Sequence, residues 1–169
     1  MGMMGSLSNQ IILPEQKAIF DYWRQQCLNK GLPSHRDIDP TFIKQFLPTV
    51  SLMEVCHAGY DKRYKIRLAG TGLYNFFDEE ITGRYVDELP YGDRTDYWER
   101  IYDRITKTGR PRIGVTRPGT PSGSHMYQFW IRMPLSCDGS KINMVLGFDK
   151  FLKSNQLKGE MFESQKIAV

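Results

Sequence analysis

Alternation of apolar residues in three segments constrains the fold of this chain most. Apolar side chains occupy every second position at 64–68, at 127–135 and at 142–148. A period of two is typical of β-strands that bury one face. Together with apolar segments elsewhere, the pattern predicts strands near residues 50–56, 63–69, 112–118, 126–136 and 141–149, paired as one antiparallel sheet.

Segments with helical spacing precede and separate these strands. Pro14 suits the first turn of a helix that Gly31 ends, and Asp93 to Thr108 has acids at its start and bases at its end. Short helical turns are expected at 40–48 and 70–77. The order predicts an α+β fold, in which a five-stranded antiparallel sheet carries helices on one face and an N-terminal flanking helix.

The chain has 169 residues, of which 40% are hydrophobic, as expected for one globular domain. We expect residues 1–13 to be a disordered N-terminus or vector remnant, 14–152 to form the domain and 153–169 to be a C-terminal tail. Three widely spaced cysteines and the lack of a signal peptide or a long apolar run indicate a reduced, cytoplasmic protein without membrane contact.

The net charge of +4 is too small to indicate a nucleic-acid partner. Its distribution is uneven, since residues 78–99 hold eight acids and two bases, and residues 100–117 hold six bases and one acid. The acidic neighbour argues against nucleic-acid binding. An adaptor that uses the basic 100–117 segment remains an alternative, which a salt-dependent binding assay would test.

Several short motifs follow one another between residues 15 and 152. They are Leu32-Pro33, Arg36 with Asp37-Ile38-Asp39-Pro40, Leu47-Pro48, Tyr64 to Thr71, Thr82-Gly83-Arg84, Gly109-Arg110-Pro111, Pro134-Leu135 and Gly147-Phe148. In this order the chain resembles the PAS superfamily, and more narrowly a PAS-like family of short, mostly alphaproteobacterial proteins. The resemblance implies a stand-alone sensory module that binds a small molecule or a partner signalling protein and acts through protein contacts.

Apolar and aromatic side chains of the helices and strands are expected to converge between the sheet and the helices. A ring-lined pocket for a small molecule is one interpretation, and a filled core is the other. Two arginines, Arg67 and Arg132, occupy polar strand positions, where solvent exposure is expected and anchoring of an anion or acidic partner is the alternative. The candidate pocket residues are Tyr74, Phe76, Phe77, Tyr97, Ile101, Phe129, Met133, Met144 and Leu146.

The first helix carries an apolar stripe outside the core PAS elements. We expect the stripe to mediate a homodimer, because an exposed apolar surface of this size is rare on a monomer. The alternative is that it covers the open face of its own sheet. The stripe residues are Ile19, Phe20, Trp23, Cys27 and Leu28.

A small enzyme with an α+β pocket, such as an isomerase or dehydratase, is a second hypothesis. It would need an acid/base pair in the cavity. Tyr74 and Tyr97 are candidates, but no carboxylate has a clearly inward position, so no catalytic residue is assigned. The spacing of cysteine and histidine fits no metal site.

We predict that the purified protein is colourless, with neither haem nor flavin. The 93–108 helix has no histidine for haem, and Cys56 and Cys137 end strands instead of lying in a reactive motif on the helical block. An absorbance spectrum of the pure protein checks this. A Soret or flavin band would contradict it.

Overall fold

The sheet has five antiparallel strands in the order β2-β1-β5-β4-β3. The computed structural model describes residues 7, 9–11 and 13–159, and of residues 29 and 30 only the backbone. The strands are β1 (Val50–Ala58), β2 (Asp61–Ala69), β3 (Arg112–Thr116), β4 (Met126–Leu135) and β5 (Met144–Lys153). The predicted α+β class with one five-stranded antiparallel sheet is therefore confirmed, although η2 lies with α2 and not on the face that carries the other helices. β5 runs four residues further than expected.

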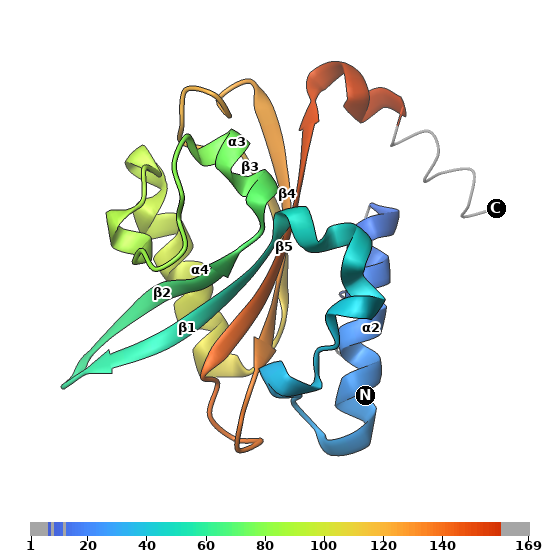
Figure 1. Cartoon of the computed structure of the whole chain (residues 1–169), viewed down its shortest axis with the longest axis vertical. Coiled ribbons are helices and arrows are strands. Elements are labelled where there is room, and N and C mark those ends of the chain that lie inside the picture. Colours follow the sequence, from blue (N-terminus) through green and yellow to red (C-terminus); the bar gives the residue numbers. More distant parts are fainter. Residues whose placement is uncertain (1–6, 8, 12, 160–169) are drawn as a thin grey trace.

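Helices lie on both sides of this sheet (Figure 1). One side carries α2 (Pro14–Lys30) and the 3-10 segment η2 (Pro40–Thr49), and the other carries α3 (Tyr74–Phe77) and α4 (Thr95–Thr108). Shorter 3-10 turns are η1 (His35–Asp37), η3 (Thr71–Leu73), η4 (Val86–Glu88) and η5 (Gly92–Arg94). We call the sheet face toward α4 the inner face and the face toward α2 the outer face.

Both faces of the central strands are buried. The outer face packs Ile131, Met133 and Leu146 against α2 and η2, and the inner face packs Trp130 and Val145 against α3 and α4. Alternation along β4 therefore separates two cores instead of separating core from solvent.

Helix α4 buries residues one position beyond the two that were expected to line a pocket. Trp98, Tyr102 and Ile105 are its buried residues, whereas Tyr97 and Ile101 are partly buried at the margin of the same cluster. Trp98 and Tyr102 are four apart, as one helical face requires. Tyr97 and Ile101 therefore each lie one position before a buried residue of this helix.

The apolar stripe of α2 packs on its own sheet. Ile19, Phe20 and Trp23 have no measurable exposure, and the Trp23 Nε1–H donates to the Pro134 carbonyl at 3.0 Å. Cys27 is half-buried and Leu28 is 82% exposed. The prediction that this stripe forms a dimer interface is wrong, because the outer face of β4 and β5 already covers its three central residues.

Packing also extends slightly beyond the expected domain limits. Leu13 is buried and contacts a small cluster with Phe129 and Leu152. Lys153 ends β5, and residues 154–159 form a helical turn. The rest of the expected N-terminal and C-terminal tails lies largely outside the described residues. No helix in the described part of the chain is long and apolar enough to cross a membrane.

We expect Trp23→Ala to lower the free energy of unfolding by about 3–5 kcal/mol, because it removes a fully buried ring. Leu28→Ala, from the same stripe, should change it by no more than about 0.5 kcal/mol, since that side chain is solvated. Urea unfolding measures both. Equal losses, or a Trp23 variant that is fully stable but of lower mass by light scattering, would contradict the intramolecular packing.

Candidate functional site

The nine candidate pocket residues do not share one space. Phe77 is buried in the inner core, and Phe76, Tyr97 and Ile101 pack against it. Met133, Met144 and Leu146 belong to the outer core, Phe129 packs with Leu13 and Leu152 in a third cluster, and Tyr74 is 55% exposed. The expectation of one shared cavity is wrong, because the strand residues point to the side of the sheet opposite α4.

A charged side chain occupies the inner face where a cavity was expected. Arg132 is 5% exposed and lies on β4 directly opposite Gly147 of β5. Its Nη2 donates to both carboxylate oxygens of Asp149 at 3.0 Å, and its Nε donates to the Tyr102 hydroxyl at 3.1 Å. Its Nη1 donates to the carbonyls of Ile131 and Phe148 at 3.0 and 3.2 Å. The expectation that Arg132 is exposed is therefore wrong.

The acidic partner is equally enclosed. Asp149 is 2% exposed and also accepts a hydrogen bond of 2.7 Å from the Gln128 Nε2. Burial acts to lower the pKa of Arg132, but the Asp149 carboxylate outweighs it and holds that pKa above its ordinary value. Burial raises the pKa of Tyr102, and Arg132 offsets this only in part. Arg132 is thus charged beside a neutral phenol at physiological pH.

Aromatic rings and two glycines make room for this polar cluster. The Arg132 Cζ lies 4.9 Å from the ring centroid of Trp98 and 5.9 Å from that of Trp130. A Cβ on Gly147 would approach the Arg132 Cζ to 3.1 Å, and one on Gly114 would collide with the Trp130 ring. Each glycine lies on the neighbouring strand, directly opposite the large residue that it accommodates. We call Arg132, Asp149, Tyr102, Gln128, Trp98 and Trp130 the inner-face cluster.

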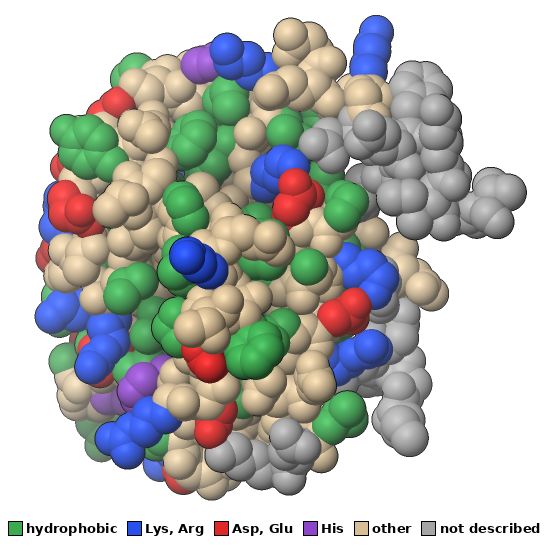
Figure 2. Space-filling model, turned by 45° about the vertical axis from the view of Figure 1, so that its right-hand side comes forward, with side chains coloured by type: hydrophobic (Ala, Val, Ile, Leu, Met, Phe, Trp, Pro, Cys, Tyr) green, Lys and Arg blue, Asp and Glu red, His purple; other side chains and the backbone are tan. Residues whose placement is uncertain are grey.

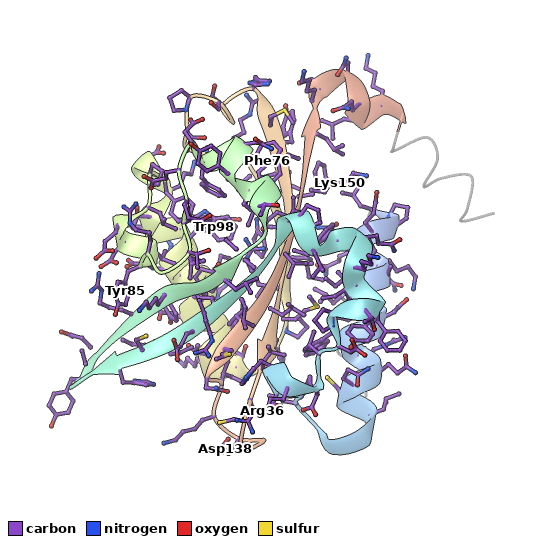
Figure 3. The ribbon with its side chains drawn as sticks, viewed as in Figure 1. Arg36, Phe76, Tyr85, Trp98, Asp138 and Lys150 are labelled. Carbon is purple, nitrogen blue, oxygen red and sulfur yellow. The ribbon has the colours of Figure 1, made fainter. Side chains whose placement is uncertain are left out.

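A groove of about 730 Å³ opens beside the end of this cluster. Its walls come from the start of α2, the end of η2, Phe76 of α3 and residues 148–151 of β5. Figure 3 labels Phe76 and Lys150 on its two flanks. The residues lining it are Pro14, Glu15, Ala18, Gln45, Phe46, Pro48, Thr49, Phe76, Phe148, Asp149, Lys150 and Phe151.

Aromatic rings dominate the contacts around this groove. Phe76 and Phe151 stack with ring centroids 3.6 Å apart, and Phe46 meets Phe148 edge to face at 5.4 Å. Lys150 forms an ion pair with Glu15 at the start of α2. Asp149 reaches both the groove and Arg132, so the groove borders the inner-face cluster through one residue.

Other chemistry-bearing residues do not gather into a site. Among the described residues, no group of three histidine, cysteine, aspartate or glutamate side chains could hold a metal ion. Tyr74 is largely solvated, and the Tyr97 hydroxyl accepts a hydrogen bond of 3.0 Å from the Trp130 Nε1. Arg67 is exposed as expected and pairs with Glu54 at 3.6 Å.

Sequence reasoning missed the inner-face cluster because β4 was assumed to have one solvated face. A signal was present in the sequence. Trp130 and Arg132 lie on the same face of β4, and Gly147 and Asp149 lie on the same face of β5. Strand pairing places Trp130 opposite Asp149 and Arg132 opposite Gly147. A tryptophan among the supposedly solvated positions was the indication that this face is covered.

Comparison with known proteins identifies the fold independently. Residues 13–148 match a family model described as a PAS domain. A light-oxygen-voltage domain from a study with a flavin analogue is 11% identical, with a TM-score of 0.52 over 75% of this chain and 93% of that one. VqmA from Vibrio cholerae, as a dimer without target DNA, is 13% identical, with a TM-score of 0.53 over 70% of this chain and 53% of that one. At these identities the likeness shows the fold alone.

VqmA bound to DPO gives a similar result, with 14% identity and a TM-score of 0.52 over 68% of this chain and 58% of that chain. This chain thus matches little more than half of the length of VqmA. No curated protein matches the chain significantly.

We expect Arg132→Met and Asp149→Asn each to lower the free energy of unfolding by about 3–5 kcal/mol, because each leaves the other side chain buried and unpaired. The double variant should lose less than the sum of the two, with a coupling of up to about 3 kcal/mol. The exposed pair Arg67 and Glu54 is the matched control, and its coupling should be below about 1 kcal/mol. Additive losses at 132 and 149 would show that the pair is not coupled.

Proposed function

This chain belongs to the PAS domain family, and on that premise we propose that it is a sensory or regulatory module that binds at the groove and signals through protein contacts. Family membership supports a sensory role without catalysis. The occupant of the groove is a small molecule or a segment of a partner signalling protein. The three unpaired cysteines, Cys27, Cys56 and Cys137, support a cytoplasmic setting.

One observation carries the proposal. Asp149 lines the groove and holds Arg132, and Arg132 in turn donates to Tyr102 of α4. An occupant that contacts Asp149 or its neighbours would change the balance between arrangements of this chain of hydrogen bonds. A ligand shifts such a balance only by binding one arrangement more tightly than the other. The inner-face cluster therefore links the groove to α4, which packs on the same face of the sheet.

The filled inner face supports binding at the groove instead of between the sheet and α4. Trp98, Tyr102, Trp130 and Arg132 fill the space under that helix. A haem or flavin placed there would displace them, so a colourless protein stays our prediction. An enzyme of the isomerase or dehydratase type is disfavoured, because Asp149 is already held by Arg132 and Gln128.

Charge distribution gives little support to a nucleic-acid adaptor. Within the basic 100–117 segment, Asp103 pairs with Lys62 at 3.1 Å, and the Arg117 Nη2 donates to the Tyr127 hydroxyl at 2.8 Å. Figure 2 shows blue and red side chains interspersed on the visible face instead of gathered by sign. A homodimer remains part of the proposal, but it must use a surface other than the buried centre of the α2 stripe.

We predict that a ligand found by thermal-shift screening of metabolites binds the wild-type protein and not Ala18→Trp, which fills the groove from an exposed position on α2. At a concentration one hundred times its Kd, such a ligand stabilises the fold by about 2.7 kcal/mol. The control is Gln25→Trp, on the same helix but outside the groove. Native mass spectrometry reads the retained ligand and the oligomeric state together. Binding that survives Ala18→Trp would contradict the proposed site.

A further inference from the structure

We propose that the groove is a strand-addition site, in which an extended, apolar segment of a partner protein pairs with the backbone of β5 beyond Phe148. The inference rests on the proposed function and deepens it by naming the occupant. It starts from a mismatch in length between β1 and β5.

The mismatch leaves part of β5 with a strand on one side only. β4 pairs with β5 from Leu135 opposite Met144 to Met126 opposite Lys153. β1 pairs only with residues 144–148, because it begins at Val50 and η2 leads the preceding chain away. Residues 149–153 thus have no β1 residue opposite them. The groove reaches residues 149–151 of this stretch, which at ~3.3 Å per residue is about 10 Å of strand, enough to pair with a short peptide segment.

The backbone direction in this stretch suits an added strand. The Val55 N–H donates to the Asn143 carbonyl at 3.0 Å, so the odd-numbered positions of β5 direct their backbone groups toward β1. Alternate residues of an antiparallel strand direct these groups to opposite sides. The N–H and C=O of Phe151 therefore point to the side on which β1 is missing. The Lys153 N–H at the end of the stretch is held by the Gln156 Oε1 at 2.8 Å.

The side chains around this stretch indicate which segment fits. Phe151 belongs to the inner core and stacks on Phe76, whereas Phe148 belongs to the outer core and meets Phe46. Side chains of an added strand alternate between the two faces. Each face of that strand would then meet a pair of rings. The occupant should therefore carry apolar side chains on both faces. An acidic side chain in the occupant would gain little from Lys150, because Lys150 is already paired with Glu15.

The outer edge of β2 is built in the opposite way. Lys65 forms a bridge with Tyr85, and the Ile66 N–H donates to the Arg84 carbonyl at 2.8 Å, so an irregular segment covers part of that edge. Lys62, Arg63 and Lys65 add charge along the strand. Charged side chains and covering segments are how proteins protect exposed edges from pairing. Residues 149–151 instead line a groove with aromatic walls.

The test uses peptides and leaves the protein sequence unchanged. Random peptides displayed on phage are selected on the full chain, and the best binder is synthesised with two variants that are N-methylated at alternate residues. N-methylation removes the N–H and blocks pairing on one edge of the peptide. One variant should bind about tenfold or more weakly, because it loses the hydrogen bonds to β5, and the other should bind nearly as well as the parent.

Position is tested with the groove variants. Ala18→Trp should abolish binding of the parent peptide, and Gln25→Trp should leave its Kd unchanged. Equal loss from both methylated peptides, binding that survives Ala18→Trp, or failure to select any peptide would overturn the inference. A homodimer that dissociates in Ala18→Trp would show that a second copy is the occupant and would also overturn it.

Failure here is distinguishable from failure of the proposed function. If no peptide binds as expected but a small molecule binds the wild-type protein and not Ala18→Trp, the groove is supported as the binding site and strand addition is excluded. If neither peptides nor small molecules depend on Ala18, both proposals fall together.

Discussion

The buried ion pair between Arg132 and Asp149 is the interaction on which the inner half of the structure depends. Removing two charges from water is costly, and the cost is met only where every polar atom finds a partner. Arg132 finds them on β4, β5 and α4, through Ile131, Phe148, Asp149 and Tyr102. The pair thereby fixes how α4 sits on the sheet, a constraint that apolar packing alone leaves less specific.

The position of this ion pair also determines that the inner face is filled. Trp98 and Trp130 enclose the guanidinium, and Gly114 and Gly147 provide the space for Trp130 and Arg132. With the inner face filled, the described groove lies at the end of the sheet, where β5 outruns β1. Asp149 belongs to both places. The groove and the position of α4 are therefore connected by a few directional bonds.

The fold was more predictable than the site. Strand alternation, helix caps and the order of motifs gave five antiparallel strands and the two long helices close to their observed limits. The prediction of the candidate pocket was wrong at one step, which was the choice of the face of β4 and β5 that points to α4. A shift of one residue moves every side chain of a strand to the opposite face, so one wrong assumption misplaced Phe129, Met133, Met144 and Leu146 together.

The sequence by itself determined the elements, their order and the resemblance to the PAS superfamily, because periodicity and turn residues are local properties of the chain. Only the tertiary structure decided that α2 covers its own sheet, that Arg132 is buried and that β5 extends past β1. Each of these depends on which surfaces meet across the sheet, as Trp23 meets Pro134 and Arg132 meets Asp149. Local patterns do not specify such pairings, since a residue's burial is set by elements far from it in the sequence.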